Sequence, residues 1–279
     1  GLAWLARTDR LRLPRRSRDP LPVAPHFGVM LAFGQYLLGF VGFGLADQVA
    51  RGAALAGRGL ELVGLAGYYA AQLPVPAVLP RLPRDPEGVE RAADRASWGV
   101  TVAHGVVGLL VAWPLAMLAT GGAAAVVTWM TGESPEALAH TTLVSLLESE
   151  RDAMLLAQCA LIVVAAPFFE ELLYRRLLQG SARGLGLGPW TSVTTVSVLF
   201  VVMHAGVLAW HAMPGLFVMS MAFGFVYERT GRLAAAVLLH ALFNLGNLLL
   251  AFGLASDGSV GPATMAWLGG SESLPVMLP

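Results

Sequence analysis

Residues 154–176 read MLLAQCALIVVAAPFFEELLYRR, and this stretch decides the class of fold. It carries no charged side chain before Glu170 and then places two glutamates and two arginines within seven residues. About 20 mostly apolar residues are needed to cross the ~30 Å hydrocarbon layer of a bilayer. We therefore expect a membrane-spanning helix over 153–178, with ionisable groups near its end.

The composition of the whole chain agrees with a membrane protein. Of its 279 residues, 56% are hydrophobic and 13% are charged, whereas soluble domains average roughly 45–50% and about 25%. The mean hydropathy is +0.65. These values exclude a disordered protein, a nucleic-acid binder and an ordinary cytosolic enzyme. The single cysteine, Cys159, excludes an intrachain disulfide.

Apolar runs predict an all-α fold, a polytopic transmembrane bundle of about seven helices. The expected spans are 28–46, 59–77, 98–130, 153–178, 189–206, 213–228 and 233–254. Pro114 is expected to kink the third span, and a short amphipathic surface helix is expected around 135–149. We also consider the hypothesis that Gly1–Ala6 (GLAWLA) ends one further span.

The positions of the arginines predict how this bundle is oriented across the membrane. All 18 basic residues are arginines, and cytoplasmic loops of membrane proteins are enriched in basic residues. If the N-terminal segment is cytoplasmic and the seven spans alternate, 15 arginines fall on the cytoplasmic side. Only Arg51, Arg58 and Arg151 fall on the other side, with the acidic segment 131–152. We expect an integral protein of the bacterial inner membrane with a cytoplasmic N-terminal segment.

Three clusters of polar residues lie in spans where such groups are costly. Glu170 and Glu171 directly follow the apolar part of the stretch 154–176. Glu171 is four residues from Arg175, so Glu171 and Arg175 can pair on a helix. His204 follows Phe200 by one turn, and His240 and Asn244 share one face of the last span. Each cluster also has a plain structural explanation: charges at the membrane interface, a packing histidine, or hydrogen bonds between helices.

Together the clusters supply the parts of a hydrolytic site. A carboxylate can act as general base, an imidazole can hold water, and a carboxamide can donate to an oxyanion. The depth of His204 does not fit easily: counted from the expected boundaries, it lies nearer the opposite membrane face than Glu170 and His240. Either its helix starts later than Pro189 or that helix is tilted.

These motifs resemble a known family. Glu170-Glu171-Leu-Leu-Tyr-Arg175, Phe200-Val-Val-Met-His204 and His240-Ala-Leu-Phe-Asn244, in this order on successive helices, are similar to the CAAX protease and bacteriocin-processing family. This family, also called the CAAX amino-terminal protease or Abi family, includes the Ras-converting CAAX endopeptidases. The run Tyr-Glu-Arg-Thr-Gly at 227–231 is also similar. The resemblance covers about 160–250; Arg176 stands where many members have glycine.

The resemblance implies an α-helical intramembrane endopeptidase with catalytic residues Glu170, His204, His240 and Asn244. Glu170 would deprotonate water, His204 would help to hold it, and His240 and Asn244 would stabilise the oxyanion. Glu171 and Arg175 would orient the site through their ion pair.

Metal dependence has two readings. Glu170, His204 and His240 could hold a zinc ion with an open coordination position. The other reading is metal-free catalysis by the glutamate with the same residues. The chain has no His-Glu-x-x-His motif, so no cofactor is certain and we favour metal-free chemistry.

The expected partners are a membrane-associated peptide or protein substrate and the lipid bilayer, without nucleic acid; the sequence leaves the oligomeric state and the substrate's identity open. The alternative function is an inactive membrane scaffold, immunity or transport-accessory protein of the same fold. A proton-coupled transporter is less consistent with the absence of an internal repeat.

We expect four segments. They are a basic cytoplasmic segment (1–27), accessory transmembrane helices with polar loops (28–152), a catalytic transmembrane core (153–254) and a flexible tail (255–279).

Overall fold

The computed structural model describes residues 12–14, 17, 19–82, 95–135, 141–147 and 149–256. Within these ranges the chain is helical and has no β-strand, so the expected all-α fold is confirmed. The stretch Gly1–Ala6 and the tail beyond residue 256 lie outside the described residues. The expected division into accessory helices and catalytic core stays a prediction.

The α-helices follow the apolar runs of the sequence. They are α2 (Pro25–Gly52), α3 (Gly57–Ala70), α4 (Pro74–Val78), α6 (Trp98–Thr131), α7 (Thr141–Leu147), α8 (Ala153–Ala160), α9 (Ala166–Glu171), α10 (Gly180–Gly184), α11 (Pro189–Met203), α12 (Met213–Thr230) and α13 (Leu233–Ser256). Two π-helical segments, η2 (Leu161–Ala165) and η3 (Leu172–Gln179), join α8, α9 and α10 without a break. Two short 3₁₀ turns are η1 (Leu79–Arg81) and η4 (Trp210–Ala212).

Local sequence signals set several helix boundaries. Proline occupies the first turn of α2 and α11, where its missing N–H has no helical partner to lose. Gly132 and Gly231 end α6 and α12 with positive φ angles of 76° and 65°. An L-residue with a side chain rarely adopts this conformation, so glycine is the residue suited to stop these helices.

All seven expected spans form helices, but they are not equally long. Among the described residues, five helical stretches are long and apolar enough to cross a membrane: 25–52, 57–81, 98–131, 153–184 and 233–253. The helix α11 has 15 residues, about 22 Å at 1.5 Å per residue, which is less than the hydrocarbon thickness. The helix α12 has 18 residues but ends in a polar Tyr-Glu-Arg-Thr run. The expected surface helix is present over 141–147, and Leu146 packs with Leu155 and Leu248.

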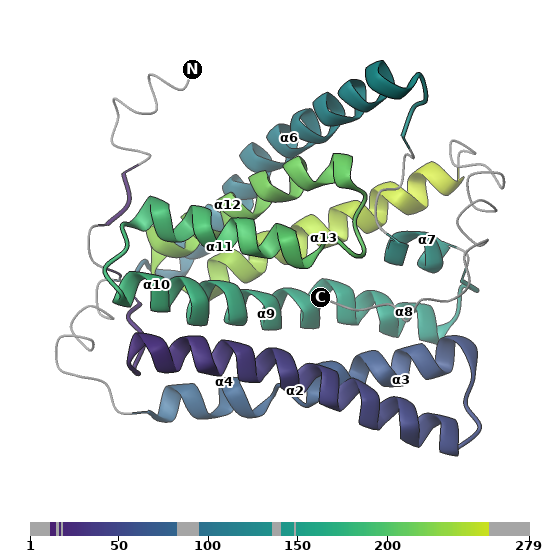
Figure 1. Ribbon diagram of the computed structural model, residues 1–279, viewed down its shortest axis with the longest axis horizontal. Helices are drawn as coiled ribbons and strands as arrows, with labels where there is room; N and C mark the ends of the chain where they lie inside the picture. The colour runs from purple at the N-terminus through teal and green to yellow at the C-terminus, as the bar shows by residue number, and fades with distance from the viewer. Residues whose placement is uncertain are drawn as a thin grey trace.

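The elements from α8 to α10 form one continuous helical stretch over 153–184, which lies in the middle of the bundle (Figure 1). The pair α2 and α3, continued by α4, packs on one side of it, and α6, α11, α12 and α13 lie on the other side. Residues 153–184 therefore contact both groups of helices. The main hydrophobic core fills the space between η3, α11, α12 and α13.

The pairing of α2 with α3 depends on small residues. A Cβ added to Gly67 would lie 2.3 Å from the Cβ of Ala46 and 2.6 Å from the backbone oxygen of Gly42. Such close backbone approach is typical of helix pairs in membranes, where packing replaces the hydrophobic driving force.

The Arg-rich segments meet at one end of the bundle. Arg95 and Arg176 pair with Asp19, and Arg229 donates to the backbone oxygen of Arg12 at 2.8 Å. Four segments that the sequence assigned to one membrane side therefore lie together. At the opposite end, Arg58 pairs with Asp152 at 2.9 Å.

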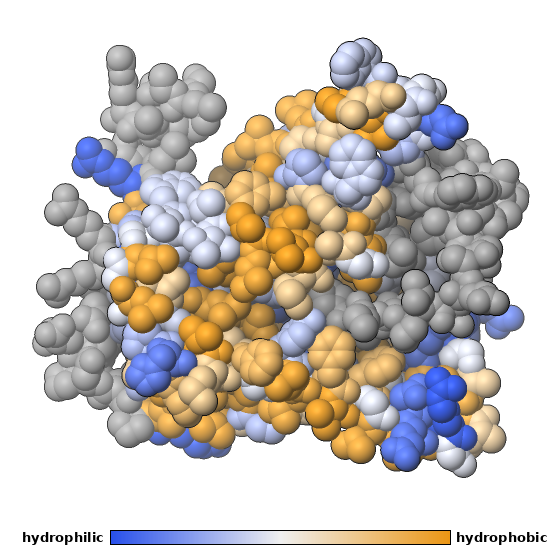
Figure 2. Space-filling view, in the orientation of Figure 1, coloured by the Kyte–Doolittle hydropathy of each residue, from blue (hydrophilic) through white to orange (hydrophobic). Residues whose placement is uncertain are grey.

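The surface carries an apolar belt between these ends. Large apolar side chains stay exposed along α2 and α6, including Phe33, Val41 and Leu110. Figure 2 shows hydrophobic side chains across the middle of one face and hydrophilic ones towards its left and lower right edges. This pattern fits a protein whose middle is solvated by lipid, and the chain is an integral membrane protein.

Candidate active site

Both glutamates of the first motif lie at the end of α9, between the two π-helical segments. π-helical turns inside α-helices are rare and often occur at functional sites. The side chain of Glu171 is fully buried, whereas that of Glu170 keeps 15% of its surface exposed. The two neighbouring carboxylates therefore have different surroundings.

Glu171 is held by a buried ion pair. Its Oε2 accepts a hydrogen bond from Nε of Arg175 at 2.9 Å, and both side chains are fully buried. The pair that the four-residue spacing predicted is therefore present. Arg175 also donates through Nη2 to Oγ of Ser220 on α12 at 2.8 Å. Its guanidinium lies 5.5 Å and 5.7 Å from the ring centroids of Phe200 and Phe223, where cation–π attraction adds to the pair.

His240 of α13 connects the two glutamates. Its Nδ1 lies 2.9 Å from Oε1 of Glu171, and its Nε2 lies 3.9 Å from Oε2 of Glu170. Because a carboxylate only accepts, Nδ1 carries the proton in this bond and Nε2 faces Glu170. The ring of Phe223 stacks on the imidazole at 4.5 Å with an interplanar angle of 15°.

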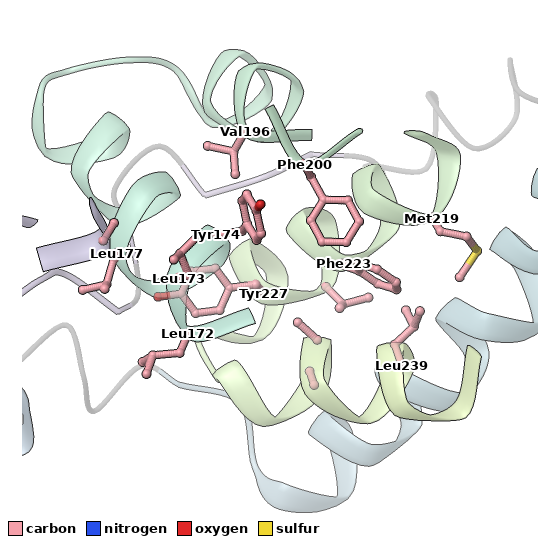
Figure 3. Packing of buried hydrophobic residues seen from close by; sticks show 14 of the residues in the cluster. Leu172, Leu173, Tyr174, Leu177, Val196, Phe200, Met219, Phe223, Tyr227 and Leu239 are labelled. Carbon is pink, nitrogen blue, oxygen red and sulfur yellow. The ribbon is translucent and has the colours of Figure 1, made fainter. Parts of the chain in front are cut away.

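His204 lies directly after the last residue of α11. Its Nδ1 is 2.7 Å from the backbone oxygen of Phe200, and its ring packs at 4.5 Å against the Phe200 ring. The same phenylalanine ring lies 6.0 Å from that of His240, so the two histidines contact one aromatic side chain. Figure 3 shows Phe200 in the core between Tyr174 and Phe223.

The depth problem of His204 has a structural explanation. The helix α11 does begin at Pro189, so a later start is wrong. Instead, the glutamate-bearing helix continues to Gly184 rather than ending near 178. Glu170 is then 14 residues before Gly184, and His204 is 15 residues after Pro189. Tyr174 lies one helical turn after Glu170, and Phe200 lies one helical turn before His204. The centroids of these two rings are 4.8 Å apart, so Glu170 and His204 lie at similar depth.

Asn244 is partly buried on α13, one turn after His240. Its Nδ2 donates to the backbone oxygen of Ile162 in η2 at 2.9 Å. This bond ties α13 to the π-helical segment that precedes the glutamates. The carboxamide therefore reaches the glutamate-bearing helix, with one of its two N–H groups engaged there.

The candidate zinc ligands do not fit a metal site in this arrangement. Among the residues that the structure describes, no three His, Cys, Asp or Glu side chains are placed so that they could hold one metal ion. Glu170, His204 and His240 are therefore not assembled as a three-ligand set, and we derive no step through a metal.

Arg176, which stands where many family members have glycine, binds the segment before α2. Its Nη1 donates to the backbone oxygens of Asp19 and Pro20 at 2.6 Å and 3.1 Å. The Asp19 carboxylate also accepts from the hydroxyl of Tyr227 at 2.9 Å. Arg176 therefore binds the segment before α2 to the end of the bundle. No local sequence motif predicts this contact.

Sequence reasoning missed several residues that support the site. Ser220 and Phe223 on α12 hold Arg175 and His240, although that span carried no candidate residue. Gln35 of α2 is buried and donates both to the backbone beside Glu170 and to Gln72, which is buried in the turn that follows α3. The signal for both glutamines was present, since each is a polar residue in an apolar span.

The comparisons with known proteins agree with the motifs. Residues 152–246 match the model of a family described as type II CAAX prenyl endopeptidase Rce1-like, and this range contains all three motifs. The family resemblance of this segment, about a third of the chain, is therefore confirmed. No curated protein and no solved structure matches the chain.

Proposed function

We propose that this chain, whose residues 152–246 match a CAAX-type membrane peptidase family, is an intramembrane endopeptidase that cleaves a membrane-associated peptide or protein. One observation carries the proposal. His240 is held at Nδ1 by Glu171 at 2.9 Å and directs Nε2 towards Glu170 at 3.9 Å. This is the arrangement of a positioned imidazole beside a second, chemically available carboxylate.

The surroundings of the two glutamates support different roles for them. Both oxygens of Glu171 accept hydrogen bonds, one from Arg175 and one from His240. Glu171 is therefore suited to orient the site. The Glu170 carboxylate lies 3.9 Å from Nε2 of His240, beyond direct hydrogen-bond distance. That separation lets one water contact both groups at about 2.8 Å, an ordinary hydrogen-bond length.

In the proposed reaction, Glu170 removes a proton from this water as the water oxygen attacks the carbonyl carbon of the scissile peptide bond. The proton passes to the leaving amine as the C–N bond breaks, which yields a carboxylate and an amine. His204 helps to hold the water. With a proton on Nε2 as well as on Nδ1, His240 donates to the negative oxygen of the tetrahedral intermediate, together with the second N–H of Asn244.

The proposed orientation rests on charge. The bundle end where Asp19 meets Arg95 and Arg176 collects the Arg-rich segments, so we assign it to the cytoplasmic side.

The test uses purified wild-type protein in detergent and a panel of membrane-anchored peptides, with and without a C-terminal prenyl group, analysed by mass spectrometry. Glu170→Gln keeps the shape of the side chain but removes the base, and we expect cleavage to fall by about 10²- to 10⁴-fold. Gln158→Met, a buried change on α8, is the matched control and is expected to keep wild-type activity.

Two outcomes would contradict the proposal. Cleavage by Glu170→Gln at the wild-type rate would remove the proposed base. A loss of wild-type activity on treatment with 1,10-phenanthroline that zinc restores would show that the metal-free mechanism is wrong.

A further inference from the structure

Gln35 is a buried polar residue that the proposed reaction does not use. It lies on α2 with no exposed surface and is separated from the first motif by more than 130 residues of sequence. Its Nε2 donates to the backbone oxygen of Phe169 at 2.9 Å and to Oε1 of Gln72 at 3.0 Å. Both N–H groups of the amide are therefore used.

The acceptor of the first of these bonds is the peptide group directly before Glu170. Phe169 O belongs to the peptide group that joins Phe169 to Glu170, so a bond to this oxygen restricts the orientation of the peptide plane from which Glu170 continues. The ring of Phe169 is held from the same side, because Tyr69 of α3 stacks on it at 5.6 Å with an interplanar angle of 16°. The pair α2–α3 therefore contacts Phe169 through both its backbone oxygen and its ring.

The helix α9, which carries Glu170, needs contacts of this kind to hold it in place. The helix α9 has only six residues and lies between the π-helical segments η2 and η3. π-helical turns interrupt the regular hydrogen-bond ladder that makes a long helix stiff. On the far side the stretch is held by the bond from Asn244 to Ile162 O and by the bond between His240 and Glu171. Gln35 supplies a corresponding bond, to Phe169 O, from the side on which α2 and α3 pack.

The Gln35 amide is satisfied through its N–H groups but not through its oxygen. Oε1 of Gln35 is buried and has no hydrogen-bond partner among the described residues. A buried polar atom without a partner costs about 1–3 kcal/mol, which offsets part of the stability that the two donated bonds contribute. The two donated bonds are what the amide provides and an apolar side chain does not.

We propose that Gln35 is a positioning residue, which sets the direction of the Glu170 side chain by binding the Phe169 carbonyl; the inference rests on the proposed function for its effect on rate. It gives the helices of the first half of the chain a role in the site. Gln72, in the turn that follows α3, supports Gln35 and donates through its own Nε2 to Tyr68 O at 3.1 Å, but Gln35 makes the bond to Phe169.

The test compares two like substitutions in the full chain, Gln35→Met on α2 and Gln72→Met in the turn that follows α3. Both replace a buried glutamine by an apolar side chain of similar size, and only the first removes the bond to Phe169 O. We expect Gln35→Met to lower kcat by about 10- to 100-fold, since small misplacements of a reacting group cost this much. KM should stay within about twofold of the wild-type value, because Gln35 has no exposed surface with which to contact a substrate.

A second measurement separates this inference from the proposed function. Amide hydrogen–deuterium exchange over 161–179 should be faster in Gln35→Met than in Gln72→Met, at equal melting temperatures. This readout needs no activity, so it decides on Gln35 even if the wild type cleaves no peptide. Equal effects of the two substitutions, or no change in either readout, would overturn the role of Gln35.

Discussion

Replacing Arg175 by methionine removes the cation of the buried pair and leaves the carboxylate of Glu171 with His240 as its neighbour. Both partners of the pair are fully buried and 2.9 Å apart. Removing one partner of such a pair typically costs about 3–5 kcal/mol, because the other charge stays buried without compensation. Arg175→Met should therefore lower the free energy of unfolding by that amount, a factor of roughly 10²–10⁴ in the folding equilibrium.

The double substitution Arg175→Met/Glu171→Gln removes both charges. It should cost much less than the sum of the two single substitutions, because neither remaining side chain is an isolated buried ion. The bond from Arg175 to Ser220 is lost in the single and in the double variant, so its contribution cancels from the difference. We expect a coupling energy of about 2–3 kcal/mol.

The assay is reversible unfolding in mixed micelles with rising SDS content, followed by tryptophan fluorescence for all four proteins. The coupling energy is the difference between the sum of the single effects and the effect of the double variant. If the single effects add to within about 0.5 kcal/mol, the pair does not interact and the reasoning is wrong. Activity needs no measurement here, since the argument concerns stability.

Two further predictions concern other parts of the bundle. Gly67→Leu should destabilise the protein by about 1–3 kcal/mol, because the contact with α2 has no room for a side chain; Gly44→Leu, with nothing within 4 Å, should be nearly neutral in the same melting experiment. The pKa of Asp152 is lowered by the N–H of Leu155 and by Arg58. Its stabilisation is therefore present above the unfolded pKa of about 3.9 and is lost as pH falls through the lower folded value. The difference in Tm between wild type and Asp152→Asn should be largest above about pH 5 and shrink towards pH 3.

Equal melting temperatures for Gly67→Leu and Gly44→Leu would contradict the tight packing of α2 on α3. A difference between wild type and Asp152→Asn that grows as the pH falls would have the wrong sign for a carboxylate with a lowered pKa.

The class of fold and the candidate residues could be predicted because both are local properties of the chain. Hydropathy over about 20 residues marked every span, and the four-residue spacing of Glu171 and Arg175 predicted their ion pair. The end of the glutamate-bearing helix was harder to predict. Polar residues at 175–184 suggested an early end, but Arg175, Arg176 and Gln179 are buried against α12 and the segment before α2, so the helix continues to Gly184.

By itself, the sequence determined that this is a helical membrane protein, that its Arg-rich segments share one side, and which residues form the three motifs. Only the tertiary structure decided that Glu171 and not Glu170 binds Nδ1 of His240, and that Gln35 holds the backbone beside Glu170. The physical reason is distance along the chain. Neighbouring glutamates look alike in sequence, and their surroundings are set by helices 69 and more than 130 residues away, whose packing no local pattern specifies.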